Sequence, residues 1–428
     1  MASANQTKRS SFQSTYTSDS FRAVFMGLSW NQIAILSIFL FSGAGSFMNA
    51  AVQSMIDAWP QLSPAEVRLV TSLPSLVSLP VTVLIGSIAG KKISYRFCAI
   101  CGTALIMLAG IAPFFFSSNW MLILFFRALV GVGVGFIAMR NSLILESVPQ
   151  DQQAKVIGYG SSLMNAGAMA AAPIVGLLAG LRWDFPFLID ILAIIPLEIM
   201  VFFLKEPQWN ITSAKAALSA DSLKAECIPC HTKKGVKCSW RVIYYILMQF
   251  IATAALYPLL SGISSYMAAN NIGSSFLAGI AISAYGLAGV MINLFFHPLI
   301  QRLKTRILGI MCMVFAVGMA LILFLPTLPS ILTGVVLAGI SFNAMMSVFQ
   351  LYNGKAAGSV LAPVTATFLI ASLSLGNFVS VYFINFCHTI FQRSSDIEST
   401  YLGSLICYII LGLLSFIIRV APKEEYDL

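Results

Sequence analysis

Residues 184–205 are DFPFLIDILAIIPLEIMVFFLK, and between its charged ends this stretch is apolar at every position except two carboxylates. A helix needs about 20 apolar residues to cross the hydrocarbon core of a bilayer, so the stretch predicts a membrane-spanning helix. Asp190 and Glu198 lie inside it, each more than one helical turn from its ends. The same stretch therefore indicates a membrane protein and supplies the first candidate functional residues.

Similar apolar blocks fill the rest of the chain, of which 58% is hydrophobic and 10% charged, whereas soluble domains are about 25% charged. Alternating segments of about 10 residues, which a membrane β-barrel would need, are absent. We expect an all-α membrane protein with twelve transmembrane helices in two pseudo-symmetric six-helix bundles. The predicted spans are 31–56, 65–89, 97–117, 119–146, 155–181, 185–204, 242–268, 273–297, 307–326, 328–352, 358–388 and 400–419.

A long polar joint divides the chain six spans against six. An internal repeat supports this division, since GSIAGKKISYRFCAIC (86–101) aligns without gaps to HPLIQRLKTRILGIMC (297–312). The expected organisation is a cytoplasmic N-terminal tail (1–30), an N-terminal bundle (31–204), a cytoplasmic linker (205–241), a C-terminal bundle (242–420) and a cytoplasmic tail (421–428).

Basic residues mark the sidedness of the loops. With the N-terminal tail in the cytoplasm, twenty of the 25 Lys and Arg residues lie in cytoplasmic segments. Arg68, Arg182 and Arg393 are assigned to outer loops, and Arg127 and Arg140 lie within a span. Because basic loops stay on the cytoplasmic side, we expect a multi-pass protein of the inner (cytoplasmic) membrane with both termini in the cytoplasm. Basic residues distributed in this way do not form the single face that nucleic-acid binding requires.

The joint after the second span carries a motif. Gly86-Ser-Ile-Ala-Gly90-Lys91-Lys92-Ile-Ser-Tyr-Arg96 resembles the glycine-plus-basic signature between helices 2 and 3 of the major facilitator superfamily. The resemblance implies that two six-helix halves rock about a central site, and that these residues act in the conformational switch. Gly90 stands where the family usually has an acid, which implies a weakened latch.

A second motif lies in the fourth span. Arg127-Ala-Leu-Val-Gly131-Val-Gly133 resembles a superfamily signature that is associated with coupling in proton-driven members. An arginine within a span costs roughly 2.5–3.5 kcal/mol or more, so it either finds partners in the interior or extends toward the membrane surface. The glycines permit close helix packing and favour the interior. Arg140 is a further candidate, which either contacts substrate or pairs with Glu146.

The resemblance continues into the fifth span. Glu146, followed by Pro149, is similar to the family's junction between spans 4 and 5, and we expect it to serve in structural latching. Ala172-Pro173-Ile-Val-Gly176 is similar to the end of the family's antiporter signature, with Ala172 in place of a glycine. This similarity points to export by antiport, in which Pro173 and Gly176 let the helix bend and pack closely.

Asp190 and Glu198 are candidates for proton coupling or substrate binding, because acids inside a membrane are costly and usually functional. At 100° per residue, their separation places them about 80° apart around the helix, which excludes a shared carboxylate pair. The alternative for each is a position at a membrane interface. Neutral candidates for binding are Asn49, Gln53, Gln249, Tyr257 and Asn343.

No cofactor and no metal are expected. The chain lacks the phosphate-binding loop of an ATP-driven pump, so the energy for transport must come from a gradient. Cys227, Cys230, His231 and Cys238 are residue types that bind zinc. Reduced thiols in a cytoplasmic linker are the favoured alternative.

The predicted function is secondary active transport rather than enzymatic catalysis. Few charges among many Phe, Met and Tyr favour an amphipathic organic molecule over a sugar. We expect a proton-coupled exporter that works by alternating access, acts as a monomer in the lipid bilayer and binds its small-molecule substrate and protons. The alternative is a proton symporter that imports a small organic anion, whose carboxylate Arg127 and Arg140 would bind.

Overall fold

The computed structural model describes residues 29–89, 93–148, 150–206, 240–392 and 395–418. Within these ranges the chain is helical apart from short turns and one isolated bridge between Ala89 and Ile93. Eleven helices are long and apolar enough to cross a membrane, and one bent pair raises the number of candidate spans to twelve. The predicted all-α fold with twelve transmembrane helices is therefore confirmed, and the chain is a multi-pass membrane protein.

Six of these spans come from the first half of the chain. Their helices are α3 (Trp30–Leu40), η1 (Ala44–Ala51), α4 (Val52–Ala58), α5 (Pro64–Ile88), α6 (Tyr95–Phe115), α7 (Trp120–Ile137), α8 (Arg140–Ser147), α9 (Gln150–Leu181), η2 (Phe185–Ala193) and α10 (Ile194–Phe203). Two spans are irregular. The first is bent by 42° between α3 and the segment over residues 44–58, and the sixth begins as the 3₁₀ helix η2.

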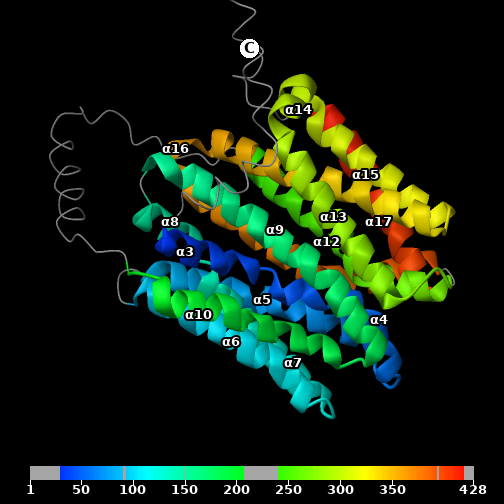
Figure 1. The fold of residues 1–428 in the computed structure, drawn as a ribbon. Helices are drawn as coiled ribbons and strands as arrows, with labels where there is room; N and C mark the ends of the chain where they lie inside the picture. The colour runs from blue at the N-terminus through cyan, green and yellow to red at the C-terminus, as the bar shows by residue number, and fades with distance from the viewer. Residues whose placement is uncertain (1–28, 90–92, 149, 207–239, 393–394, 419–428) are drawn as a thin grey trace, which may run out of the picture.

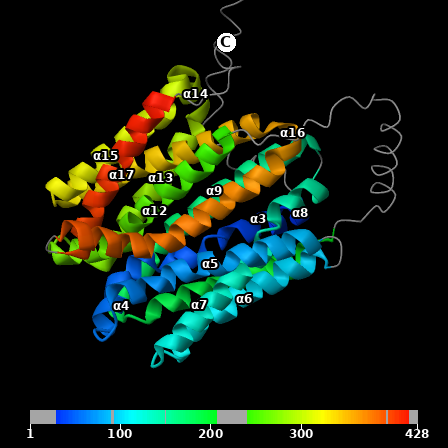
Figure 2. The ribbon, with the colours of Figure 1, turned by 180° about the vertical axis from the view of Figure 1, so that it is seen from behind.

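The remaining spans come from the second half. Their helices are α12 (Trp240–Ala269), α13 (Ser275–Leu294), α14 (Phe296–Leu303), η3 (Lys304–Arg306), α15 (Ile307–Phe324), α16 (Leu328–Phe391) and α17 (Asp396–Ile418). Two predicted spans, 328–352 and 358–388, fall within the single run α16 of 64 residues. A straight helix of that length would measure about 96 Å, and α16 instead doubles back on itself (Figures 1 and 2).

Polar caps determine where several helices begin. Ser29 starts α3 with a capping box, and Ser63 does the same for α5, where Pro64 takes the first helical position. Ser94 and Asn119 accept hydrogen bonds from the first free N–H groups of α6 and α7. Such caps satisfy donors that have no partner within the helix, and they place the ends of the spans at the polar joints of the sequence.

Buried apolar side chains form two clusters, one within residues 34–204 and the other within residues 245–411. The linker end of the molecule is where α10 ends at Phe203 and α12 begins at Trp240. The far end is where α4 ends at Ala58 and α17 begins at Asp396. From the far end the two halves diverge toward the linker end (Figures 1 and 2).

The halves meet mainly through α9 against α13 and through α5 against α16. Toward the far end, the Ser54 and Ser275 hydroxyls lie 3.3 Å apart. Near the middle of the spans, the Asn377 amide donates to the Ser75 hydroxyl over 2.7 Å. These polar contacts join the halves in the part of the molecule away from the linker end.

Several sequence predictions fall outside the described residues. They concern the predicted tails and most of the linker. They also concern the motif residues Gly90, Lys91 and Lys92, Pro149, and the possible zinc ligands Cys227, Cys230, His231 and Cys238.

Candidate functional site

Two of the predicted charges form a buried ion pair inside the first half. Arg127 of α7 and Asp190 of η2 are both fully buried, and Arg127 Nη1 lies 3.8 Å from Asp190 Oδ2. Neither carboxylate oxygen has a hydrogen-bond donor in the part of the chain that the structure describes. Among the described residues, Arg127 is therefore the only charged or hydrogen-bonding partner of this carboxylate.

Backbone carbonyls provide the other partners of Arg127. Nε donates to the carbonyl of Val70 over 2.9 Å, and Nη2 donates to the carbonyl of Gly45 over 2.7 Å. In an α-helix the Val70 carbonyl would accept from residue 74, but Pro74 has no N–H. Gly45 lies in the 3₁₀ segment η1, beside the bend of the first span. Arg127 thus binds carbonyls at two irregularities of the backbone, which is how non-helical backbone is tolerated at membrane depth.

Glycines make room for this arrangement. A Cβ atom at Gly110 of α6 would collide with the carboxyl group of Asp190. On α7, a Cβ at Gly131 would meet the backbone of Pro74, and one at Gly133 would meet the backbone of Gly102. Because these side chains are absent, α7 approaches both α5 and α6 closely, and the interior position expected for Arg127 is the one observed.

Arg140 and Glu146 do not form the pair considered from the sequence. The Arg140 guanidinium lies 5.0 Å from the centre of the Phe39 ring, and its buried Nε has no partner among the described residues. The Glu146 carboxylate instead accepts from the Tyr95 hydroxyl over 2.8 Å. Their six-residue spacing, which places them on different sides of a helix, explains why other partners are preferred.

The two acids of the sixth span lie in different surroundings. Asp190 is fully buried beside Arg127, whereas Glu198 of α10 is exposed. The structure therefore brings Asp190 to Arg127 and leaves Glu198 outside this site.

Neutral candidates from the first span approach the second half of the molecule. The backbone N–H of Gln53 donates to the Ser264 hydroxyl over 3.3 Å, and the Gln53 amide donates to Asp57 over 2.7 Å. Asn49 is buried in η1. Tyr257 of α12 lies beside the side chain of Ser46, the residue that follows Gly45.

The remaining neutral candidates serve packing within the second half. Gln249 donates to the Leu369 carbonyl over 2.9 Å, and its buried Oε1 has no partner among the described residues. Asn343 donates to the Gly339 carbonyl over 2.9 Å within α16 and lies against Gly289 of α13. Neither side chain lies beside the ion pair of the first half.

The described switch-motif residues lie at the linker end of α5 and α6. Gly86 is exposed, with open space around it. Arg96 donates through Nη2 to the Val201 carbonyl over 2.7 Å. Glu206, which the sequence did not single out, accepts from the backbone N–H groups of Tyr95 and Arg96, each over 2.8 Å. A carboxylate at a helix N-terminus is favourable, and Glu206 thereby ties the segment after α10 to α6.

Pro173 and Gly176 lie where the halves touch. Pro173 leaves the Met169 carbonyl without its helical donor, and the Ser283 hydroxyl of α13 lies 2.6 Å from that oxygen. A Cβ at Gly176 would collide with the backbone of Ser275. The antiporter-like motif therefore forms part of the contact between α9 and α13.

Two charged residues near the predicted outer loops are buried. Arg68 was placed in an outer loop, but it is 2% exposed in α5, where it experiences the charge of Asp396 in α17. Asp184, which precedes the sixth predicted span, is fully buried and pairs with Arg182 over 2.6 Å. Tertiary packing covers both side chains, and the hydropathy of a single span does not reveal such burial.

Among the described residues, no group of three or more His, Cys, Asp or Glu side chains is placed to hold a metal ion.

The model of the Major Facilitator Superfamily matches residues 33–381 of this chain. The chain belongs to the major facilitator superfamily. The family resemblance drawn from the sequence motifs is confirmed, and so is the fold that it implies. Among the relatives of this superfamily member are proteins named for multidrug resistance.

Multidrug resistance protein MdtG of Proteus mirabilis is 26% identical over 260 residues, which are 60% of this chain and 60% of that protein. The chain thus spans less than two thirds of that relative's length. MdtG of Citrobacter koseri is 25% identical over 324 residues, or 75% of this chain and 72% of that protein.

Solved structures share the fold at low sequence identity. A D-xylose–proton symporter has a TM-score of 0.73 at 14% identity, with 92% of this chain and 97% of that chain covered. The nucleoside transporter NupG has a TM-score of 0.70 at 14% identity, with 91% and 99% covered. The family and these neighbours are transporters.

Proposed function

We propose that this chain is a secondary active transporter that exports amphipathic small organic molecules in exchange for protons. The observation that carries the proposal is the buried Arg127–Asp190 pair, whose carboxylate oxygens have no donor among the described residues. A proton on Asp190 neutralises the only charge that the described structure pairs with Arg127. Protonation therefore changes what holds Arg127 in place.

The partners of Arg127 connect this change to the contact between the halves. Once Asp190 is neutral, Arg127 depends on the carbonyls of Val70 and Gly45. Next to Gly45, Ser46 lies beside Tyr257 of the other half, where η1 packs against α12. If one conformation of these segments binds the proton more tightly than another, protonation shifts the equilibrium toward that conformation. This path would link protonation to the rocking of the halves in alternating access.

The proposed substrate class rests on two supports. The relatives named above are multidrug resistance proteins, at 25–26% identity. The chain is also rich in apolar side chains and contains 31 Phe residues, which suits amphipathic compounds better than sugars. Its family and fold neighbours are transporters, and we propose no enzymatic activity for it.

The proposed sidedness follows from the basic residues, which would place the linker end and both termini in the cytoplasm. With this orientation, the divergence of the halves at the linker end (Figure 1) corresponds to a state that faces the cytoplasm. We propose the inner membrane as its location and a monomer as its working unit.

One observation favours the alternative, import of a small organic anion with protons. The buried Nε of Arg140 has no partner among the described residues and the guanidinium lies over Phe39. A cation beside an aromatic ring can bind an organic carboxylate. If the protein is such a symporter, Arg140→Gln should abolish substrate binding. If the protein exports cations, the same variant should still bind its substrate.

Transport by purified protein in proteoliposomes with an imposed pH gradient tests the proposal. Lipophilic cations and organic anions are assayed in both directions, together with proton flux. We expect substrate to move against the proton flow, and uptake along with inward protons would replace the exporter by the symporter. Asp190→Asn should lose substrate-linked proton flux, and Glu198→Gln, an exposed acid on the same span, is the matched control. Coupled flux that survives Asp190→Asn would contradict the role of the ion pair.

A further inference from the structure

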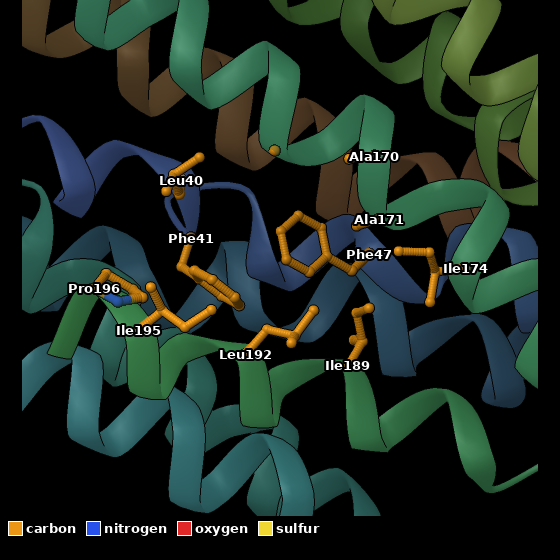
Figure 3. Close-up of a pocket in the computed structure, with 11 residues that line it drawn as sticks. Leu40, Phe41, Phe47, Ala170, Ala171, Ile174, Ile189, Leu192, Ile195 and Pro196 are labelled. Atoms are coloured by element: carbon orange, nitrogen blue, oxygen red, sulfur yellow. The ribbon is translucent and has the colours of Figure 1, made fainter. Parts of the chain in front are cut away.

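An apolar cavity of about 200 Å³ lies between the first, fifth and sixth spans (Figure 3). Its walls come from the bend between α3 and η1, from the middle of α9, and from η2 and α10. Leu, Phe, Ile, Ala, Pro and Gly residues line it, so no polar side chain faces an occupant. An apolar cavity of this kind does not retain water, because water needs polar partners.

The cavity opens toward the membrane rather than toward the other half. Ile174 and Leu192, which line it, are each 42% exposed, and Ile195 is 54% exposed. Leu177 and Ile194 beside them are also exposed. Exposed apolar side chains in the middle of spans face lipid, so the mouth of the cavity is continuous with the lipid-facing surface.

The depth of the cavity in the bilayer indicates which part of a lipid molecule can enter the cavity. Leu40 lines the cavity ten residues after Trp30, where the first span begins at the linker end. That separation corresponds to about 15 Å along a helix, or half of a hydrocarbon core that is about 30 Å thick. At the midplane of a bilayer there are acyl-chain ends and no head groups.

We propose that the cavity binds the terminal part of a phospholipid acyl chain, and that the bound chain supports the two segments that hold the Arg127–Asp190 pair. Its volume accommodates several methylene groups. An amphipathic transported compound fits less well, because its polar groups would be buried there without partners. The lining therefore selects a plain hydrocarbon chain, a ligand separate from the proposed substrate.

The same short segments form the cavity and the ion-pair site. Phe47 lines the cavity two residues after Gly45, whose carbonyl binds Arg127. Leu192 lines it two residues after Asp190. In Figure 3, the side chains from these segments point into the space between them. A bound chain fills this space, and its loss would let both segments shift.

Photo-crosslinking tests the binding site. The protein is reconstituted with a phosphatidylcholine that carries a diazirine at the end of one acyl chain, and labelled peptides are mapped by mass spectrometry. We expect label on residues 167–174 and 189–196. Ala170→Trp, at the exposed rim of the cavity, should reduce this labelling at least fivefold. Ile195→Trp, which places an indole on the opposite wall, should reduce the labelling equally. Leu177→Trp, exposed on the same helix but outside the lining, is the matched control and should keep the label.

Equal labelling in Ala170→Trp, Ile195→Trp and Leu177→Trp would overturn the proposal, and so would label spread evenly over the lipid-facing residues. Displacement of the label by a transported compound would assign the cavity to substrate instead. Asp190→Asn should still be labelled even if it no longer transports, so that failure of the lipid site and failure of the proposed function are distinguishable.

Hydrogen exchange tests the support of the ion pair. The protein is held in a fluorinated surfactant, which does not mimic a hydrocarbon chain, with and without added phosphatidylcholine. Lipid should slow exchange of residues 40–47 several-fold in the wild type and in Leu177→Trp. It should have no such effect in Ala170→Trp, where an indole occupies the rim. Exchange in the wild type that is independent of lipid would overturn this part of the proposal.

Discussion

At the scale of single residues, the Arg127–Asp190 pair makes a prediction about stability. Asp190→Leu removes the acid and leaves the Arg127 charge buried without its ionic partner. Breaking a buried pair in this way costs about 3–5 kcal/mol. We expect a loss of that order in the free energy of unfolding, measured by denaturant titration of the purified protein in detergent.

The double variant Arg127→Met/Asp190→Leu separates the charge from the packing. It should recover part of the loss because no buried charge remains, but not all of it, because the Val70 and Gly45 carbonyls lose their donor. A double variant that is no more stable than Asp190→Leu would show that the pair contributes little through charge.

Gly110 gives a second prediction, because its missing side chain is what leaves room for Asp190. Gly110→Ala places a Cβ atom against the Asp190 carboxyl, and overpacking of this kind costs about 1–3 kcal/mol. Thermal unfolding in detergent should show a lower midpoint together with weaker substrate-linked proton flux. The control is Gly180→Ala, which lies in a helix with open space around it and should be neutral or slightly stabilising. Equal effects of the two substitutions would refute the steric role of Gly110.

Single charges could be predicted from the sequence, but their partners could not. Arg127 and Asp190 stand out because an ionisable side chain is rare in an apolar run. Their pairing depends on the tertiary position of η2 beside α7 and on Gly110 of a third helix. Glu198 shows the same limit, because the residues around both acids are equally apolar and do not indicate which side of the span is covered.

At the scale of elements, Pro74 predicts how α5 and Arg127 interact. Pro74→Ala supplies an N–H that can bond to the Val70 carbonyl within the helix, in competition with Arg127 Nε. We expect a helix that is at least as stable but weaker coupling, measured as fewer protons moved per substrate in proteoliposomes. Pro80→Ala, in the same helix at an exposed position, is the control and should leave the coupling unchanged. Unaltered coupling in Pro74→Ala would show that the freed carbonyl is not needed.

Apolar length predicted the spans well, because each helix must satisfy its own backbone in lipid. The irregularities were harder to predict. The bend of the first span follows from tertiary contacts, since Arg127 takes the Gly45 carbonyl, and η2 has the same apolar composition as a regular helix. Pro74 was visible in the sequence as a residue that frees a carbonyl, and this signal could have indicated where Arg127 finds a partner.

At the scale of the whole molecule, small residues let the halves pack closely where they must also separate. Gly176 leaves no room for a side chain against Ser275, and the Ser283 hydroxyl reaches the carbonyl that Pro173 frees. These contacts use few charges, so the halves can part without exposing many unpaired ions. The repeat seen in the sequence predicted two halves, but which surfaces meet depends on the packing of α9 against α13.

Rocking of the halves requires that the contact between Ser54 and Ser275 opens during transport. Their hydroxyl oxygens are 3.3 Å apart, so the sulfurs of Ser54→Cys/Ser275→Cys would lie close enough to form a disulfide after a small side-chain rotation. Oxidation of this double variant should stop transport in proteoliposomes, and a reductant should restore it. Because the chain already contains eight cysteines, each single variant is treated in the same way and should keep its activity. Full transport by the crosslinked protein would mean that the halves stay together at this point, and alternating access would then have to arise from movements within each half.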